Sequence, residues 1–413
     1  MEKINKLKVV TTQGFSGELI RESQFVFNYR TAEPACEIAL AMPLRSKSYT
    51  TNILPGVFRQ NLPEGFLLDW IKERFAKVTK MDDMTLLAIT GRDVIGRVRT
   101  LQETDDGSPK IPGEHLNSLL TWKGTEDLFS HLANQYAMAS GISGVQPKVV
   151  VPLHIDTAND VIEKISMKDR SVIVKSSGDD YPNLAENEYF CMSIAKSAGL
   201  NVPKFWLSDD KKLFIVARFD LGEKGYLGFE DMTSLMDKQD KYAGSYELLA
   251  KAVGAYTNGE LKTQSLEQLF STVALSVLLR NGDAHLKNFG LLYTDPTTND
   301  VRLSPIYDIV NTTVYIPNDP LALKLNGSKF WTATQDLIEF GKIHCYVDHP
   351  EQIIERIATA AMDYRPPEES QIWREMKPLI EKACFGLAAN KTVSIGDLSA
   401  NTDVGEKVVT AIG

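Results

Sequence analysis

The chain has few cysteines, and their spacing suggests neither a cross-link nor a metal site. Its 413 residues include only Cys36, Cys191, Cys345 and Cys384, with no C-x-x-C pair among them. This pattern argues against a zinc site and against a disulfide framework. We expect reduced, buried thiols in a cytosolic protein, and we expect the chemistry of the chain to lie in other residue types.

Long apolar runs, an excess of positive charge and internal repeats are also missing. A membrane-spanning helix needs about 20 consecutive apolar residues, and every apolar run in the chain is much shorter, so we expect no membrane helix. No apolar segment follows the first lysines, so we expect no signal peptide. The net charge of −9 argues against broad non-specific nucleic-acid binding by the chain alone, while a local basic patch or a DNA-binding partner stays compatible with it. The composition is that of a soluble globular protein, and the length predicts two or three domains.

The stretch from residue 265 to residue 308 carries the most informative pattern. Residues 265–280 repeat apolar side chains at the spacing of one helix face, at positions 266, 269, 270, 273, 274, 277 and 278. Ser265 followed by Gln268 has the form of a capping box, and Asn281-Gly282 is a stop signal. The pattern predicts a helix that ends just before a polar loop.

This polar loop and the segment after it have the order of a phosphoryl-transfer site. Asp283 and Asn288 have the spacing D-x-x-x-x-N, and a predicted hairpin of residues 289–293 and 301–303 leads on to Asp308. In protein kinases one carboxylate of this order accepts the proton of the substrate hydroxyl, while an amide oxygen and a second carboxylate hold Mg²⁺. The spacing alone recurs by chance, and a solvated loop with capping residues is the alternative. The helix, loop, hairpin and final acid together favour a kinase-type site.

A lysine at the end of a predicted strand adds a second kinase-like feature. Residues 171–175 predict a buried strand that ends at Lys175, and a helix with a capping box is expected from about residue 183, carrying Glu186 and Glu188. Kinases use a strand lysine paired with a helix glutamate to hold the α- and β-phosphates of ATP. In the alternative interpretation Lys175 extends to solvent at the strand end and the glutamates favour the helix N-terminus.

Two further segments have positions that suit nucleotide binding. Residues 141–148, Gly-Ile-Ser-Gly-Val-Gln-Pro-Lys, lead into a strand at 149–151, and their small side chains can let backbone amides approach a phosphate. This is neither a G-x-G-x-x-G nor a Walker loop, and a plain turn is the alternative. Residues 213–220 read as an apolar strand running into an acid, where a kinase hinge would meet adenine.

The chain as a whole changes from strand signals to helix signals. The first 50 residues are β-rich, and we expect helices at 63–77, 82–90 and 126–140 and a strand at 91–98, with a polar boundary at 102–113. Later helix signals fall at 245–257, 265–280, 335–340, 351–363 and 371–389.

We therefore predict an α+β protein with a bilobal, protein-kinase-like fold. Its β-rich N-terminal lobe includes an extra N-terminal subdomain, and its C-terminal lobe is all-α. The expected parts are residues 1–105 for the N-terminal subdomain, 120–225 for the kinase N-lobe with the phosphate-binding loop and hinge, and 226–413 for the helical lobe with the catalytic loop.

Taken together, these segments resemble the HipA family of bacterial serine/threonine kinases, the toxins of toxin–antitoxin modules. The matching segments appear in family order over residues 50 to 310, and the match is specific as a set. They are Asn61–Gly65, Gly91–Asp93, Ile142–Lys148, Ile173–Lys175, Glu186–Phe190, Val216–Asp220, Asn281–Asn288 and Tyr307–Asp308.

The resemblance implies roles for the polar loop and the strand lysine. Asp283 would be the catalytic base, and His285 and Lys287 would support the loop or meet the γ-phosphate. Asn288 and Asp308 would bind Mg²⁺. Lys175 would contact the phosphates of ATP.

It also implies how ATP is enclosed. Ala217 and Phe219 would present backbone groups to adenine, and Asp220 would lie near the ribose. The phosphates would be covered by the loop residues Ser143, Gly144, Val145, Gln146 and Lys148.

In the family this loop carries an autophosphorylated serine that switches the kinase off. Some relatives have Ser-Ile-Ser where this chain has Gly141-Ile142-Ser143. Ser143 is therefore the expected site of autophosphorylation, and Ser140 is the alternative.

Partners follow from the same resemblance. It implies a protein substrate of the aminoacyl-tRNA synthetase class, whose modification arrests translation, and control by a HipB-like helix-turn-helix antitoxin that binds operator DNA, in the bacterial cytoplasm. The first 100 residues would face the antitoxin. Two alternatives stay open: a small-molecule kinase of the aminoglycoside-kinase type, and a non-catalytic, kinase-shaped subunit of a transcriptional repressor. The intact set of Lys175, Asp283, Asn288 and Asp308 weighs against the second.

Overall fold

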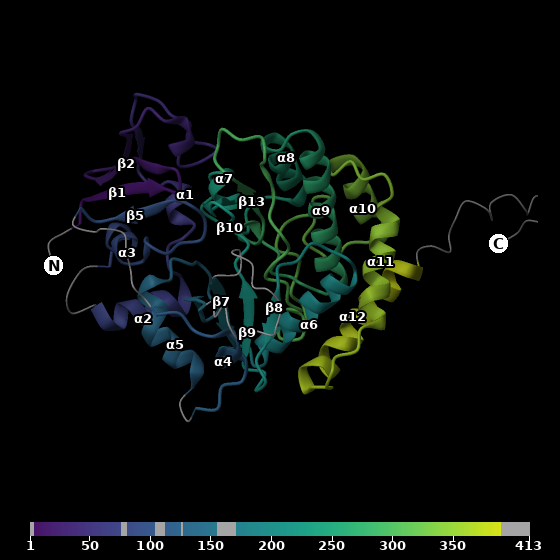
Figure 1. Cartoon of the computed structure of the whole chain (residues 1–413). Coiled ribbons are helices and arrows are strands. Elements are labelled where there is room, and N and C mark those ends of the chain that lie inside the picture. Colours follow the sequence, from purple (N-terminus) through teal and green to yellow (C-terminus); the bar gives the residue numbers. More distant parts are fainter. Residues whose placement is uncertain (1–3, 76–80, 104–111, 125–126, 155–170, 390–413) are drawn as a thin grey trace, which may run out of the picture.

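The structure, a computed structural model of the chain, describes residues 4–75, 81–103, 112–124, 127–154 and 171–389. Most of the longer strands lie in the first half of the described chain, where six α-helices accompany them, and the second half is mainly helical. Figure 1 shows the N-terminal strands (purple) at one end of the molecule and the last helices (yellow-green) at the opposite end.

The N-terminal part folds into an antiparallel sheet of five strands with a core of its own. The order across the sheet is β4-β3-β2-β1-β5, with bounds β1 Lys6–Thr11, β2 Gly14–Arg21, β3 Phe25–Tyr29, β4 Tyr49–Thr51 and β5 Arg99–Leu101. Alternate residues of the strands, such as Leu7, Val9 and Phe27, are buried, because successive side chains of a strand point to opposite faces. They pack with helices α1 (Gly56–Arg59) and α3 (Asp83–Thr90).

A second core lies on one face of a four-stranded antiparallel sheet. The order is β6-β7-β9-β8, with bounds β6 Lys148–Pro152, β7 Ser171–Ser176, β8 Phe205–Leu207 and β9 Leu213–Ala217. Helices α2 (Gly65–Phe75), α4 (Leu116–Leu120) and α5 (Leu128–Tyr136) contribute to this core. The opposite face, with Phe214 and Val216, packs on helix α6 (Leu184–Ser197).

The rest of the described chain is mainly helical and forms the largest core. Its helices are α7 Met232–Leu235, α8 Tyr246–Tyr256, α9 Gly259–Leu278, α10 Thr334–Glu339, α11 Pro350–Asp363 and α12 Gln371–Ala389. Its short strands are β10 Leu221–Gly222, β11 Gly225–Tyr226, β12 Gly228–Asp231, β13 Gly290–Tyr293 and β14 Arg302–Leu303. The antiparallel pairing of β13 with β14 confirms the predicted hairpin.

The predicted start of the central helix is wrong. Helix α9 begins at Gly259, and Ser265 lies inside it, where its hydroxyl accepts a hydrogen bond from the amide of Leu303 at 3.0 Å. The first turns of α9 are mostly exposed and polar, so they carry no apolar repeat that a sequence reading could detect.

Two other local predictions are also wrong. Asn183, at the start of α6, has a φ of 60° and its side chain makes no capping bond, so the capping box with Glu186 is not formed. Residues 91–98 form turns instead of a strand, because Gly96 has a φ of +95°, outside the extended range. Most of the expected boundary at 102–113 lies outside the described residues.

The thiols behave as expected: all four cysteines are free and buried. Within the part of the chain that the structure describes, no helix combines the length and the apolar character that crossing a bilayer requires.

Candidate active site

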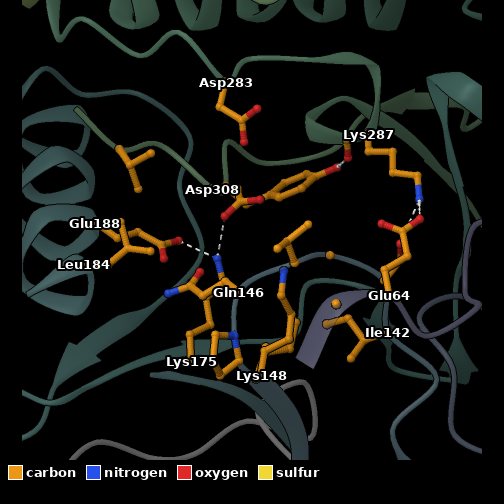
Figure 2. A pocket seen from close by; sticks show the side chains of 18 of the residues that line it. Glu64, Ile142, Gln146, Lys148, Lys175, Leu184, Glu188, Asp283, Lys287 and Asp308 are labelled. Atoms are coloured by element: carbon orange, nitrogen blue, oxygen red, sulfur yellow. Dashed lines mark hydrogen bonds and ion pairs between the residues drawn. The ribbon is translucent and has the colours of Figure 1, made fainter. Parts of the chain in front are cut away.

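Most of the predicted site residues meet in one cavity of about 750 Å³. In Figure 2, Lys148 and Lys175 from the four-stranded sheet point toward Asp308, with Asp283 beyond it. The predicted residues that line the cavity are Ser143, Gly144, Val145, Gln146, Lys148, Lys175, Ala217, Phe219, Asp283, His285, Lys287 and Asp308. Asn288 lies against Asp308, whereas the carboxylate of Asp220 is bound elsewhere.

Lys175, at the end of β7, connects the sheet with the helical region. Its Nζ lies 2.6 Å from Oε1 of Glu188 and 2.8 Å from Oδ1 of Asp308, and it is 5% exposed. Burial lowers the pKa of Lys175, but the two carboxylates outweigh burial and hold the pKa above its usual value. Of the two predicted glutamates, Glu188 is the partner of Lys175, and Glu186 is not.

The two carboxylates around Lys175 have different electrostatic surroundings. Burial raises the pKa of Glu188 to about 7, because Lys175 only partly compensates for the loss of solvent. Burial acts in the same direction on Asp308, but Lys175 and Lys148 together hold the pKa of Asp308 well below its usual range. Asp308 is therefore an anion at neutral pH, as a metal ligand has to be.

Lys148 stands directly opposite Lys175 in the pairing of β6 with β7. Both side chains are buried, and burial lowers the pKa of Lys148. Gly144 has a φ of +127°, and a Cβ at this position would lie 2.4 Å from Nζ of Lys148. The loop of residues 143–148 therefore folds over its own lysine, and the sheet end presents two cationic side chains to the cavity.

Asp283 follows the end of α9 and accepts a hydrogen bond from the hydroxyl of Tyr242 at 2.8 Å. Burial raises the pKa of Asp283, while this hydrogen bond acts in the opposite direction. His285 is buried, with Nε2 3.8 Å from Oδ1 of Asp283, and burial lowers its pKa to about 3. His285 is therefore neutral at physiological pH, and Asp283 is placed to accept a proton.

Asn288 and Asp308 place an amide oxygen and a carboxylate side by side, and both groups can act as metal ligands. The Nδ2 of Asn288 donates to the carbonyl and to Oδ2 of Asp308 at 3.3 Å and 3.4 Å. The Oδ1 of Asn288 is buried without a hydrogen-bond partner among the described residues. Asp308 has a φ of 60°, a strained conformation for a non-glycine residue that is common at functional sites. An orphaned amide oxygen beside an ionised carboxylate is a donor set that fits Mg²⁺.

Lys287 joins the polar loop to two other segments. Its Nζ forms an ion pair with Glu64 and donates to the hydroxyl of Ser143 at 2.8 Å. Burial raises the pKa of Glu64, but Lys287 outweighs burial and keeps the pKa below its usual value. Ser143 thus has its hydroxyl at the cavity.

The alternative serine has a different environment. Ser140 is fully buried, donates to the carbonyl of Tyr136 at 2.8 Å and accepts from the amide of Val150 at 2.9 Å. Its hydroxyl therefore holds the start of the loop in place.

At the predicted hinge, Ala217 and Phe219 line the cavity, but Asp220 has other partners. Arg218 donates to both carboxylate oxygens of Asp220, at 2.9 Å and 2.6 Å, and to Asp93 at 3.1 Å. Asp220 also accepts from the amide of Gly96 at 2.6 Å. Its carboxylate therefore fastens the hinge to the N-terminal part, instead of facing the cavity.

Sequence reasoning missed two residues that line the cavity, Glu64 and Tyr242. Glu64 belongs to the segment Asn61–Gly65, to which the sequence assigns no role, and Tyr242 lies in a loop that has no motif. It also missed Arg218, which holds Asp220 and Asp93 beside the predicted hinge.

Comparison with known proteins gives the family and the fold. Residues 140–364 match the HipA-like C-terminal domain, and residues 7–101 match the HipA N-terminal domain. The structure is similar to a chain of the Shewanella oneidensis MR-1 complex of HipA, HipB and operator DNA, with a TM-score of 0.65 over 93% of this chain and 97% of that chain. The sequence identity is 17%, so this likeness concerns the fold, and it confirms the predicted bilobal, kinase-like architecture.

Two curated relatives carry kinase names. “Putative kinase Y4dM” of Sinorhizobium fredii is 27% identical over 297 residues, which cover 67% of this chain and 67% of that protein. A “Putative kinase” of Haemophilus influenzae is 30% identical over 222 residues, 49% of this chain and 61% of that protein.

Proposed function

The chain belongs to the HipA family, and we propose that it is an ATP- and Mg²⁺-dependent serine/threonine protein kinase. The observation that carries this proposal is the pair of buried lysines, Lys148 and Lys175, which stand directly opposite each other and line the cavity. Like charges opposite each other destabilise a sheet. Glu188 and Asp308 pair with Lys175, but Lys148 forms no ion pair with the described residues, so the charge of this lysine is not balanced by a structural partner. Binding of the phosphate groups of ATP would balance it, because those groups supply the compensating negative charge.

A divalent metal fits beside these lysines, because Asp308 contacts Lys175. The unused Oδ1 of Asn288 and the carboxylate of Asp308 would hold Mg²⁺. When bound, Mg²⁺ neutralises negative charge on the phosphates during transfer.

The remaining side chains supply the proton transfer and the orientation. The hydroxyl oxygen of the substrate attacks the γ-phosphorus, the bond to the leaving ADP breaks, and Asp283 accepts the hydroxyl proton. Lys175 and Lys148 hold the phosphates, and backbone amides of residues 143–148 cover them. Lys287 meets the γ-phosphate, and His285 supports the loop as a neutral ring. Ala217 and Phe219 lie against the adenine.

The amide of Ala217 already donates to the carbonyl of Lys204 at 2.8 Å, so it is not available to a base. Asp220 stabilises the hinge instead of the ribose, because Arg218 and Gly96 occupy its carboxylate.

Regulation and partners are part of the proposal. Ser143, whose hydroxyl lies at the cavity, is the autophosphorylated serine, and the buried Ser140 is not. Phosphoserine adds about −1.5 to −2 charges at pH 7, which would repel ATP or displace the loop. The Shewanella relative forms a complex with HipB and operator DNA, which supports a helix-turn-helix antitoxin and operator DNA as partners here. An aminoacyl-tRNA synthetase in the bacterial cytoplasm is the proposed substrate, by family analogy.

The test uses labelled ATP, Mg²⁺ and a bacterial lysate with the wild-type chain and its Asp283→Asn variant. We expect the wild type to transfer label to protein. The D283N variant is expected to transfer label at least about 100-fold more slowly, with the same melting temperature as the wild type. Retained labelling by D283N would mean that the base is misplaced. Absence of labelled protein with the wild type would favour a small-molecule kinase, and nucleotide affinity that does not respond to Mg²⁺ would favour a non-catalytic subunit.

The regulatory part has a separate test. After incubation with ATP and Mg²⁺, peptide mapping is expected to find phosphate on Ser143. Phosphate found only outside residues 140–148 would refute the proposed switch.

A further inference from the structure

The segment Asn61–Gly65 has no role in the function proposed so far, yet it reaches the cavity. Figure 2 shows Glu64 beside Lys287, on the side of the cavity away from Glu188. The ammonium group of Lys287 pairs with Glu64 and donates to Ser143 at 2.8 Å. One lysine therefore links the N-terminal segment, the phosphate-binding loop and the catalytic loop.

The backbone next to Glu64 makes a second contact with the same loop. Gly65 has a φ of +49°, and a Cβ there would lie 2.7 Å from the Cα of Val145. Only glycine allows so close an approach in this backbone conformation. The segment thus touches the phosphate-binding loop through its backbone as well as through its charge.

We propose that Glu64 is a positioning residue of the nucleotide site, an inference that rests on the kinase function proposed above. A lysine side chain is flexible and has three donor hydrogens. Glu64 and Ser143 engage two of them, which fixes the direction of the third. With Glu64 in place, Lys287 and the loop of residues 143–148 hold one geometry before the nucleotide arrives, and less freedom is lost on binding.

The charge of Glu64 does not abolish the attraction for phosphate. Lys148 and Lys175 lie in the same cavity and supply positive charge independently of Lys287. Glu64 is half-exposed, so solvent screens its repulsion of an anion. The ordering of Lys287 and the loop is therefore the dominant effect.

The first experiment measures the affinity of the full chain for Mg²⁺–AMP-PNP by isothermal titration calorimetry. Glu64→Ala is expected to weaken binding about fivefold, the size of effect typical of a partly exposed ion pair with one further hydrogen bond. Glu64→Gln keeps an oxygen acceptor for Lys287, so we expect it to stay within about twofold of the wild type. The matched control is Glu73→Ala on the exposed face of α2, which is expected to leave the affinity unchanged.

The second experiment asks whether Glu64 acts through Lys287. In a double-mutant cycle, E64A is expected to cause no further loss once Lys287→Ala is present, because the positioned group is gone. The same fivefold loss in both backgrounds, or E64A binding as tightly as the wild type, would overturn the inference. If E64A does not fold, the cycle is run with Glu64→Met, which keeps the length of the side chain but has no oxygen acceptor, and whose loss must likewise vanish with K287A.

The two proposals fail in different ways. A wild-type chain that binds no Mg²⁺–AMP-PNP would overturn the kinase function and this inference together. A wild-type chain that binds the nucleotide, with E64A equal to it, would overturn the role of Glu64 alone.

Discussion

The ammonium group of Lys175 lies 2.8 Å from the carboxylate of Asp308, a residue 133 positions later in the chain. This contact joins the four-stranded sheet to the segment after the β13–β14 hairpin. Because Glu188 holds the same ammonium group from helix α6, three elements are fixed around one buried cation. The contact brings together the strand lysine and the second acid that the sequence identified separately.

Replacement of Lys175 by Met is expected to remove nucleotide binding and to destabilise the fold in a pH-dependent way. Two carboxylates lose their partner, which costs about 3 kcal/mol of unfolding free energy at pH 8. At pH 6 the loss is smaller, because removal of Lys175 raises the pKa of Glu188 further above its wild-type value of about 7, so that Glu188 is protonated and is no longer a buried charge. Urea unfolding at both pH values measures the difference, with Lys72→Met on exposed α2 as the control. An equal loss at the two pH values would contradict this account.

Tyr242→Phe is expected to shift the pH dependence of phosphoryl transfer. The Tyr242 hydroxyl donates to Asp283 and lowers its pKa, so removal of the hydroxyl raises that pKa. The acid limb of the rate profile should therefore move to higher pH, with a smaller effect on the rate above pH 8. A rate profile measured on Y242F and on the exposed Tyr346→Phe tests this. An acid limb that stays where it is in Y242F would show that Tyr242 does not act on the base.

Because His285 is buried as a neutral ring, the fold is expected to lose stability as the pH falls. The folded-state pKa of His285, about 3, lies below the unfolded value, so the unfolded chain binds more protons between the two values and stability falls as the pH drops through this window. From pH 7 to pH 5 the loss amounts to about 2 kcal/mol. The contribution of Glu188 to stability changes with pH in the opposite direction, because its pKa is raised in the folded state. Asp308 stays ionised throughout this window, because its pKa is depressed.

The comparison of wild type with His285→Asn isolates this term, since both proteins retain Glu188 and Asp308. Chemical unfolding at pH 5, 6 and 7 should give a flatter dependence on pH for H285N. Parallel curves for the two proteins would show that His285 is not a buried neutral ring.

Arg218→Met tests the attachment of the hinge to the N-terminal part. The guanidinium group is fully buried and binds Asp220 and Asp93, so its removal leaves Asp220 as an uncompensated buried charge. We expect a loss of about 3 kcal/mol in unfolding free energy. Arg356→Met on the exposed face of α11 is the control and should change stability by less than about 0.5 kcal/mol. A small loss for R218M would mean that solvent reaches this ion pair.

Much of the local structure could be predicted because it is encoded over short distances. The spacing of Asp283 and Asn288, the hairpin after them and the strand that ends at Lys175 are each set by neighbouring residues. The start of α9 could not be predicted, because its first turns are polar and exposed and tertiary contacts hold the rest of the helix. Gly91–Val98 failed as a strand for a related reason: the left-handed backbone at Gly96 suits a close approach to Phe229, far away in sequence.

The sequence by itself determined which chemical groups the site contains, and it did so through local spacing and through the resemblance to a family. The tertiary structure alone decided which of these groups meet. Glu186 and Glu188 look equivalent in the sequence, but the orientation in which α6 packs on the sheet brings only Glu188 to Lys175. Likewise, Asp220 follows the predicted hinge in the sequence, but its carboxylate does not face the cavity. It binds the buried Arg218 and the amide of Gly96, which is 124 residues away in the chain. The physical reason is that side-chain contacts across such distances depend on how separate hydrophobic cores pack, which no local pattern records.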